Sequence, residues 1–96
     1  MQLQTLPGFQ SFVELKDYIH TTLCHREQLD TEAFPMQEQI LKRGETRIGF
    51  LFSVLGPRSV SFNAIFETER NTIHFYNSAG ERVLSNLLQN APPKLA

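Results

Sequence analysis

Residues 46–55 alternate apolar and other side chains, and this alternation constrains the fold more than any other feature of the chain. In an extended strand, side chains at every second position share one face. One face of this segment would therefore carry Ile48, Phe50, Phe52 and Val54. Leu51 and Leu55 would lie on the opposite face. The segment is predicted to be a central strand of a sheet, with apolar side chains on both faces.

Residues 9–27 follow a helical pattern. Ser11 and Glu14 have the spacing of a capping box, in which the serine caps the helix and the glutamate reaches back to it. Spacings of three and four residues then build one apolar stripe from Phe12, Leu15, Ile19 and Leu23. Pro35 disfavours helix at the residue before it, so we expect the helix to end upstream.

Three further segments read as strands, at residues 37–42, 60–66 and 72–76. Turn residues separate them. Gly44 suits a tight turn between the first two strands, Pro57 presets a turn after residue 55, and Asn71 tolerates the left-handed conformation in a hairpin loop. These boundaries predict an antiparallel meander.

The segment after residue 77 has two interpretations. Asn77 and Gly80 favour a turn into a strand at residues 82–85. The alternative is a helix, with a stripe formed by Val83, Leu84, Leu87 and Leu88. The strand is favoured because Gly80 in a first helical turn would weaken a helix. Residues 90–96 are expected to form a loose tail.

Together these elements predict one α+β domain over residues 1–96, with an N-terminal helix packed on a four- to five-stranded antiparallel β-meander. The predicted core consists of Phe12, Leu15, Ile19, Leu23, Ile48, Phe50, Phe52, Val54, Val60, Phe62, Ala64, Phe66, Ile73 and Phe75.

Composition removes several classes of function. Nine Lys and Arg residues against ten Asp and Glu give a net charge of −1, which provides no broad field for nucleic acid or an anionic membrane. The start of the chain has no signal-peptide pattern, and the longest apolar stretch is far shorter than a membrane span. The lone Cys24 cannot form an intrachain disulfide. We expect a soluble cytoplasmic protein.

Candidate catalytic and metal-binding residues are few. His20 and Cys24 are spaced to lie on one side of the helix, but this is half of a four-ligand metal site, and no orienting group for a thiol nucleophile stands near them. Glu67 and Glu69 fall in a hairpin tip, where no apolar site would separate their pKa values. The interpretation is a protein without catalytic residues, cofactor or metal, although a site shared between subunits around His74 and Tyr76 stays an alternative.

A small basic cluster surrounds the first hairpin. Lys42, Arg43 and Arg47 could contact a phosphate, and the order of helix and strands is similar to that of a double-stranded RNA-binding module. That module has a Lys-rich start to its second helix, which this chain lacks. Weak nucleic-acid binding through this hairpin is therefore the alternative function.

The second face of the sheet supports the leading hypothesis. One helix covers about one face of a sheet this size, so apolar side chains on the other face need a different cover. The candidate interface residues are Leu51, Leu55, Ile65, His74 and Tyr76. The expected partner is a second copy, giving a homodimer, or another protein. Alternatives are a strongly coiled sheet, and tail residues Leu87, Leu88 and Leu95 folded across the face. At position 74, an exposed strand histidine is favoured over one that titrates in an interface.

Two stretches, GPRSV at residues 56–60 and ERNTIHFYNSAGER at residues 69–82, resemble a family of short, uncharacterised bacterial proteins. The resemblance covers about the C-terminal third and consists mostly of turn residues and core apolar residues. No activity is known for that family, so the resemblance implies no catalytic residue. It implies a bacterial cytoplasmic source and favours the final hairpin over a helix.

Overall fold

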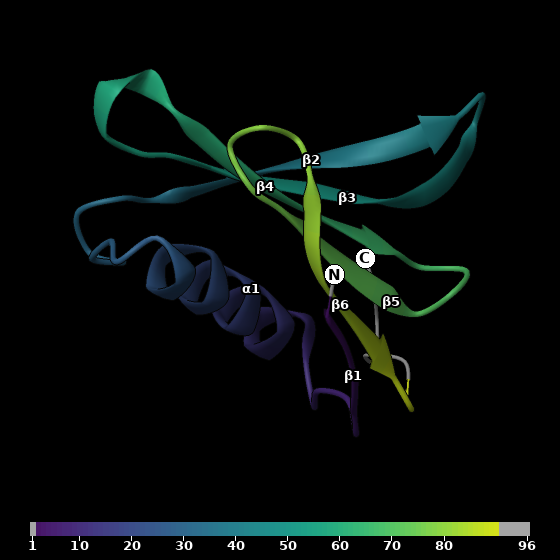
Figure 1. Cartoon of the computed structure of the whole chain (residues 1–96). Helices are drawn as coiled ribbons and strands as arrows, with labels where there is room; N and C mark the ends of the chain where they lie inside the picture. The colour runs from purple at the N-terminus through teal and green to yellow at the C-terminus, as the bar shows by residue number, and fades with distance from the viewer. Residues whose placement is uncertain (1, 91–96) are drawn as a thin grey trace.

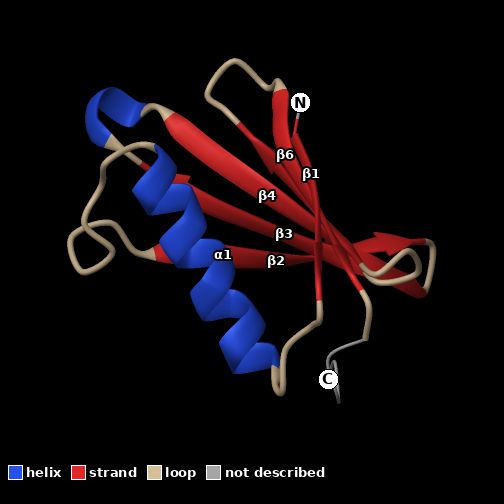
Figure 2. Cartoon of the chain, turned by 60° about the horizontal axis from the view of Figure 1, so that its bottom comes forward, coloured by secondary structure: helices blue, strands red, loops and turns tan. Residues whose placement is uncertain are grey.

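A computed structural model describes residues 2–90 of the chain. One helix packs on a six-stranded sheet with the order β1-β6-β5-β4-β3-β2 (Figure 1). The elements are β1 (Gln2–Leu6), α1 (Phe12–Arg26), β2 (Met36–Arg43), β3 (Thr46–Leu55), the short 3-10 helix η1 (Pro57–Ser59), β4 (Ser61–Glu67), β5 (Thr72–Tyr76) and β6 (Arg82–Leu88). Helix α1 lies across one face of the sheet (Figure 2), so the predicted α+β class is confirmed.

Helix α1 begins where the capping pattern predicts. The Ser11 hydroxyl accepts a hydrogen bond from the Glu14 N–H at 3.1 Å. The Glu14 carboxylate accepts from the N–H of Gln10 at 3.2 Å, one residue before the cap. At the other end, the N–H of Leu29 bonds to the Cys24 carbonyl at 2.8 Å. These bonds satisfy backbone N–H and C=O groups that helix ends leave without a partner. The helix between them is shorter than the predicted segment, residues 9–27.

Strands β2 to β6 form the predicted antiparallel meander. Gly44 and Asn71 have positive φ angles of 61° and 52° at their turns. In the last hairpin the Asn77 side-chain oxygen accepts from the N–H groups of Ala79 and Glu81, at 3.0 and 2.9 Å. The strand that follows runs to residue 88 and pairs with β5, so the helical alternative for this segment is wrong.

Strand β1 was not expected from the sequence. It pairs in parallel with β6 and makes the sheet one strand wider than the predicted meander. The pairing continues past the strands, because the N–H groups of Gln89 and Asn90 bond to the carbonyls of Leu6 and Pro7 at 2.9 and 3.2 Å. Asn90, predicted to begin a loose tail, is therefore tied to the N-terminal segment. The rest of that tail, including Leu95, lies outside the described residues.

The core lies between α1 and the sheet and contains most of the predicted residues. Its buried members are Leu15, Ile19, Leu23, Cys24, Phe50, Phe52, Val54, Phe62, Ala64, Phe66, Ile73, Phe75, Leu84 and Leu88. Phe12 and Val60 pack against this core and are partly buried. The Phe12 ring lies 4.8 Å from that of Phe50, which stacks at 6.5 Å on Phe66.

The prediction that Ile48 belongs to the core is wrong. The pairing of β2 with β3 passes from Leu41 opposite Gly49 to Lys42 opposite Arg47, so Ile48 is the extra residue of a β-bulge. A bulge interrupts the strict alternation of side chains between the two faces. Ile48 is half-buried, outside the core cluster.

A buried polar side chain joins three elements within this core. Asn86 on β6 is fully buried, and its side-chain oxygen accepts from the hydroxyl of Tyr18 on α1 at 2.5 Å. Its amide nitrogen donates to the side-chain oxygen of Gln4 on β1 at 3.4 Å. Burial raises the pKa of Tyr18, so this phenol stays a donor over the ordinary pH range.

Replacing Tyr18 with phenylalanine should therefore destabilise the fold. Tyr18→Phe leaves the buried oxygen of Asn86 without its donor, which costs about 1–3 kcal/mol of unfolding free energy. Urea denaturation measures the change. Thr21→Val is the control: Thr21 is exposed on α1, so its hydroxyl is open to water and a smaller loss is expected. Equal losses in the two variants would contradict this role of Asn86.

Candidate functional site

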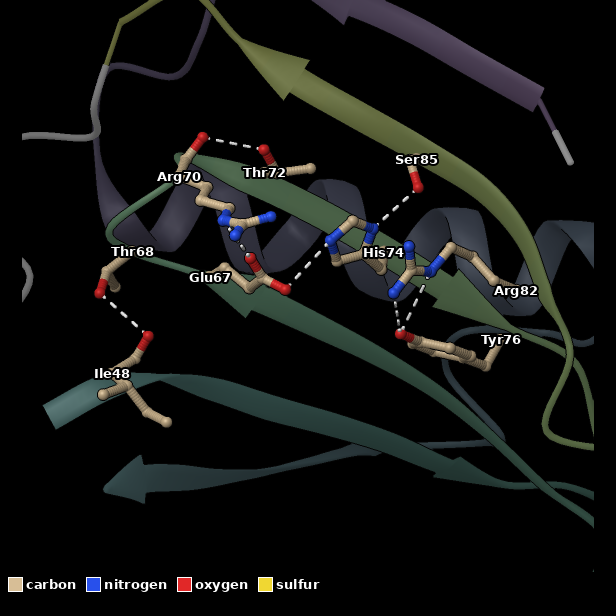
Figure 3. A network of polar contacts seen from close by, with 9 residues as sticks. All are labelled: Ile48, Glu67, Thr68, Arg70, Thr72, His74, Tyr76, Arg82 and Ser85. Atoms are coloured by element: carbon tan, nitrogen blue, oxygen red, sulfur yellow. Dashed lines mark hydrogen bonds and ion pairs between the residues drawn. The ribbon is translucent and has the colours of Figure 1, made fainter. Parts of the chain in front are cut away.

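The face of the sheet that α1 leaves open carries every candidate interface residue. The register aligns Leu51 with Ile65 and Ile65 with His74 across β3, β4 and β5. Leu51 and Ile65 are half-buried, and Leu55 at the end of β3 is 61% exposed. In Figure 3 the side chains of His74 and Tyr76 stand on this side, with α1 behind the sheet. We call this surface the helix-free face.

A chain of polar contacts crosses the helix-free face from β4 to β6 (Figure 3). Nδ1 of His74 lies 2.8 Å from the Ser85 hydroxyl oxygen, and Nε2 lies 3.2 Å from a carboxylate oxygen of Glu67. The second carboxylate oxygen of Glu67 is 3.9 Å from Nε of Arg70. Because a carboxylate only accepts, Nε2 carries the proton and Nδ1 accepts from the serine.

Two more polar pairs connect neighbouring strands on this face. Nε and Nη2 of Arg82 donate to the Tyr76 hydroxyl at 3.3 and 3.0 Å, and the guanidinium lies 5.6 Å from the tyrosine ring centre. The Ser53 hydroxyl donates to the side-chain oxygen of Asn63 at 2.7 Å. Cross-strand contacts of this kind hold polar side chains in fixed positions without a covering layer.

His74 is only 9% exposed, so the favoured interpretation of an exposed strand histidine is wrong. Desolvation lowers its pKa below the ordinary value, and the positive charge of Arg82 lowers it further. The carboxylate of Glu67 acts in the opposite direction without overcoming them. The imidazole is therefore neutral near pH 7.

The order serine, histidine, carboxylate is also that of a hydrolytic triad, but its geometry here is structural. In such a triad the serine oxygen must reach a substrate carbonyl beside oxyanion donors. Ser85 is 3% exposed and points along the sheet to His74 (Figure 3). The contacts lock β4, β5 and β6 together and leave the hydroxyl closed to a substrate.

A hollow of about 460 Å³ lies beside this polar chain, at the end of the sheet near the β2–β3 hairpin. It is lined by Leu41, Arg43, Ile48, Gly49, Ile65, Glu67, Glu69 and Arg70. At Gly49 the backbone of β4 comes close to β3, because a Cβ there would meet the Phe66 carbonyl oxygen. The bulge turns Ile48 toward the same hollow, and Thr68 holds that site by donating to the Ile48 carbonyl at 3.1 Å.

The three residues of the basic cluster lie at the same end of the sheet. Lys42 and Arg47 are cross-strand partners, and all three cations are exposed. Arg43 lines the hollow together with the carboxylates of Glu67 and Glu69. Arg43 therefore lies beside acidic groups of this hollow, and the surface at this end of the sheet has mixed charge.

His20 and Cys24 both face the loop before β2. Nε2 of His20 lies 2.7 Å from the Phe34 carbonyl oxygen, and the Cys24 sulfur lies 3.9 Å from it. Burial, with a smaller effect of Asp30, raises the pKa of the Cys24 thiol. Residues 2–90 contain no group of three or more side chains placed to hold a metal ion. The pair anchors a loop to α1.

No family model, curated protein or solved structure matches this chain. In the part of the chain that the structure describes, no helix has both the length and the apolar character to span a membrane.

The environment of His74 predicts a pH-dependent stability. The pKa of His74 is lower in the folded chain than the ordinary 6.5. At pH values between the two, the unfolded chain binds a proton at this histidine and the folded chain does not. The free energy of unfolding should therefore fall as the pH drops from about 7 to about 5.5, and His74→Gln should flatten that slope. Denaturation at a series of pH values measures it. The control is His25→Gln, which removes a histidine from the exposed side of α1. A wild-type slope in His74→Gln would show the assignment to be wrong.

Proposed function

We propose that this protein is a small non-enzymatic interaction module that forms a homodimer through its helix-free face. One observation carries the proposal: Leu51, Ile65 and Leu55 lie on a face over which residues 2–90 place no second layer. Leu87 on β6 and Leu3 on β1 add exposed apolar surface, at 43% and 66%. Apolar side chains gathered on one open face of a small protein mark an interaction site.

The dimensions of the face fit a second copy of the chain. Six strands spaced about 4.8 Å apart and a strand of seven residues give a flat footprint of roughly 650 Å². Stable interfaces bury about 800 Å² of accessible surface on each partner. Side chains that project from the sheet add to the flat footprint, so the accessible surface of this face approaches that value. The face also carries both signs of charge, because Glu67 is negative and Arg70 and Arg82 are positive. When the same surface is present on both partners, each sign of charge can meet its opposite on the second copy.

The cellular setting is part of the same proposal. The only cysteine is buried and unpaired, so the fold needs no oxidising compartment. Together with the resemblance of residues 56–60 and 69–82 to short bacterial proteins, this supports a cytoplasmic protein of bacterial origin.

Association through this face can be measured directly. Wild-type protein at tens of micromolar should sediment as a dimer. Leu51→Glu, which places a charge directly opposite Ile65 on this face, should weaken association by about 30-fold or more. Val13→Glu is the matched control, because Val13 is 62% exposed on α1, and it should leave association unchanged.

The proposal fails if the wild-type protein is a monomer at these concentrations. It also fails if Leu51→Glu and Ile65→Glu both fold, as circular dichroism would show, and still dimerise as the wild type does.

A second candidate is weak nucleic-acid binding through the β2–β3 hairpin. The observation in its favour is the register, which sets Lys42 opposite Arg47 with Arg43 beside them. These three cations can make at most three phosphate contacts, so binding to nucleic acid would be weak and strongly salt-dependent.

This candidate predicts that the protein is retained on an RNA or DNA column in low salt and released by moderate salt. Replacing the three cations with glutamine should abolish retention. No retention of the wild type in low salt would end the candidate.

A further inference from the structure

Strand β2 is an edge of the sheet, because β3 is its only neighbouring strand among residues 2–90 (Figure 2). An edge strand has backbone N–H and C=O groups that point away from the sheet and can form a ladder with a further strand. The eight residues of β2 include no proline, and the extra residue of the bulge belongs to β3, so the side chains of β2 alternate without interruption. Strand β2 therefore presents a continuous edge to a partner strand.

Three side chains on one side of β2 form an ordered row of Glu38, Ile40 and Lys42. Glu38 and Ile40 lie opposite core phenylalanines of β3, so they stand on the side of the sheet that carries α1. Lys42 follows at the next alternate position and is exposed. Ile40 is 42% exposed. The row is therefore acidic, apolar and basic in order, with its apolar residue at the centre.

Two copies of this row complement each other when the strands run antiparallel. Directly opposite residues of an antiparallel ladder share a face, so a two-fold axis that relates two identical strands is normal to the sheet and passes between two equivalent residues. With the axis at Ile40, each Glu38 lies opposite Lys42 of the second copy, and the two isoleucines meet. Opposite charges and apolar pairs at directly opposite positions both stabilise a ladder.

Neighbouring registers lack this match. An axis at Gln39 or Leu41 would set each charged side chain of β2 opposite an uncharged residue. An axis at Glu38 or Lys42 would set two like charges against each other, which destabilises a ladder. Charged side chains on an edge strand commonly prevent pairing with another chain. On β2 their order instead favours one register over its neighbours.

We propose that β2 pairs with β2 of a second copy in the register centred on Ile40, so that the sheet continues from one molecule into the next. This contact uses the edge of the sheet and does not depend on the helix-free face. It involves one strand from each copy, so it buries less than the roughly 800 Å² per partner of a stable interface. Association through the edge is therefore weaker than a stable dimer and is expected near about 1 mM protein.

The surroundings of the row leave space for this contact. Helix α1 packs over β3 and β4, about one and a half strand spacings inside β2. Two-fold symmetry then separates the two helices by about 19 Å, which exceeds the diameter of a helix, about 10–12 Å.

The charges around the row also favour the contact. Lys16 of α1 donates to Oε1 of Glu38 at 2.9 Å, so the second carboxylate oxygen can accept from Lys42 of the second copy. Within its own chain Lys42 lies opposite Arg47, and like charges at opposite positions are destabilising. A carboxylate on the other side of Lys42 offsets this repulsion.

Disulfide trapping at about 1 mM protein tests the register, in a Leu51→Glu background that weakens association through the helix-free face. At the axis, two copies of Ile40→Cys have Cα atoms about 5 Å apart, within the range of a disulfide. Gln37→Cys is the matched control, because it is exposed on the same strand but lies about 20 Å from its equivalent in this register. Ile40→Cys should crosslink at least tenfold faster than Gln37→Cys. The wild-type Cys24 is fully buried and does not compete.

Charge reversal in the Ile40→Cys chain tests the pairing of Glu38 with Lys42. Glu38→Lys sets lysine against lysine, and Lys42→Glu sets glutamate against glutamate, so each should slow the crosslink about fivefold or more. An equimolar mixture of the two variants has opposite charges in both pairs and should recover the rate, with the mixed dimer identified by its mass. Salt at about 0.15 M screens the difference in net charge. A mixture that reacts no faster than the separate variants would overturn the register.

The outcomes separate this inference from the proposed function. Equal crosslinking of Ile40→Cys and Gln37→Cys would overturn edge pairing, whereas a wild-type dimer that Leu51→Glu disrupts would leave the proposed function standing. A monomeric wild type at tens of micromolar, with Ile40→Cys still crosslinking fastest, would overturn the proposed function alone. Circular dichroism checks that each variant folds, and Ile65→Glu serves as the background if Leu51→Glu does not fold.

Discussion

The packing of α1 against one face of the sheet is the constraint on which the rest of this structure depends. The fifteen residues of the helix are about 22 Å long, against a sheet of six strands that spans about 29 Å. Beneath it Phe50, Phe52, Phe66 and Phe75 are almost completely buried, and burial of such rings is the main favourable term in folding. With the only α-helix of residues 2–90 used on this face, the opposite face has to be stabilised by side chains alone.

The helix-free face is stabilised in two different ways. Over β4, β5 and β6, polar side chains satisfy each other across the strands, as Glu67, His74 and Ser85 do. Over β3 and β4, the apolar side chains of Leu51, Leu55 and Ile65 share this face without a second layer. The first region is complete within one chain, because its polar atoms have partners. The second is the region to which we propose that a second copy adds apolar surface.

Local patterns were enough to predict the helix and strands β2 to β6, because a period of two residues and well-placed turn residues leave few alternatives.

Three features depend on distant parts of the chain and could not be predicted in this way. Strand β1 is short and largely polar, and its partner β6 comes from the other end of the chain. The half-burial of Ile48 follows from the bulge, which periodicity does not reveal. The contact between His74 and Ser85 needs the register of β5 with β6. The candidate interface residues were identified from alternation, whereas the hollow beside them depends on the bulge and on the register of neighbouring strands.

The central claim is that two copies bury the helix-free face, and solvent accessibility of methyl groups in the wild-type protein tests it most directly. Leu55 and Val13 are almost equally exposed in the single chain, at 61% and 62%. Leu55 lies on the helix-free face, whereas Val13 lies on α1. A soluble paramagnetic agent should broaden the Val13 methyl signals at a concentration where the protein is dimeric and leave those of Leu55 protected. Equal broadening of the two residues at that concentration would contradict the claim.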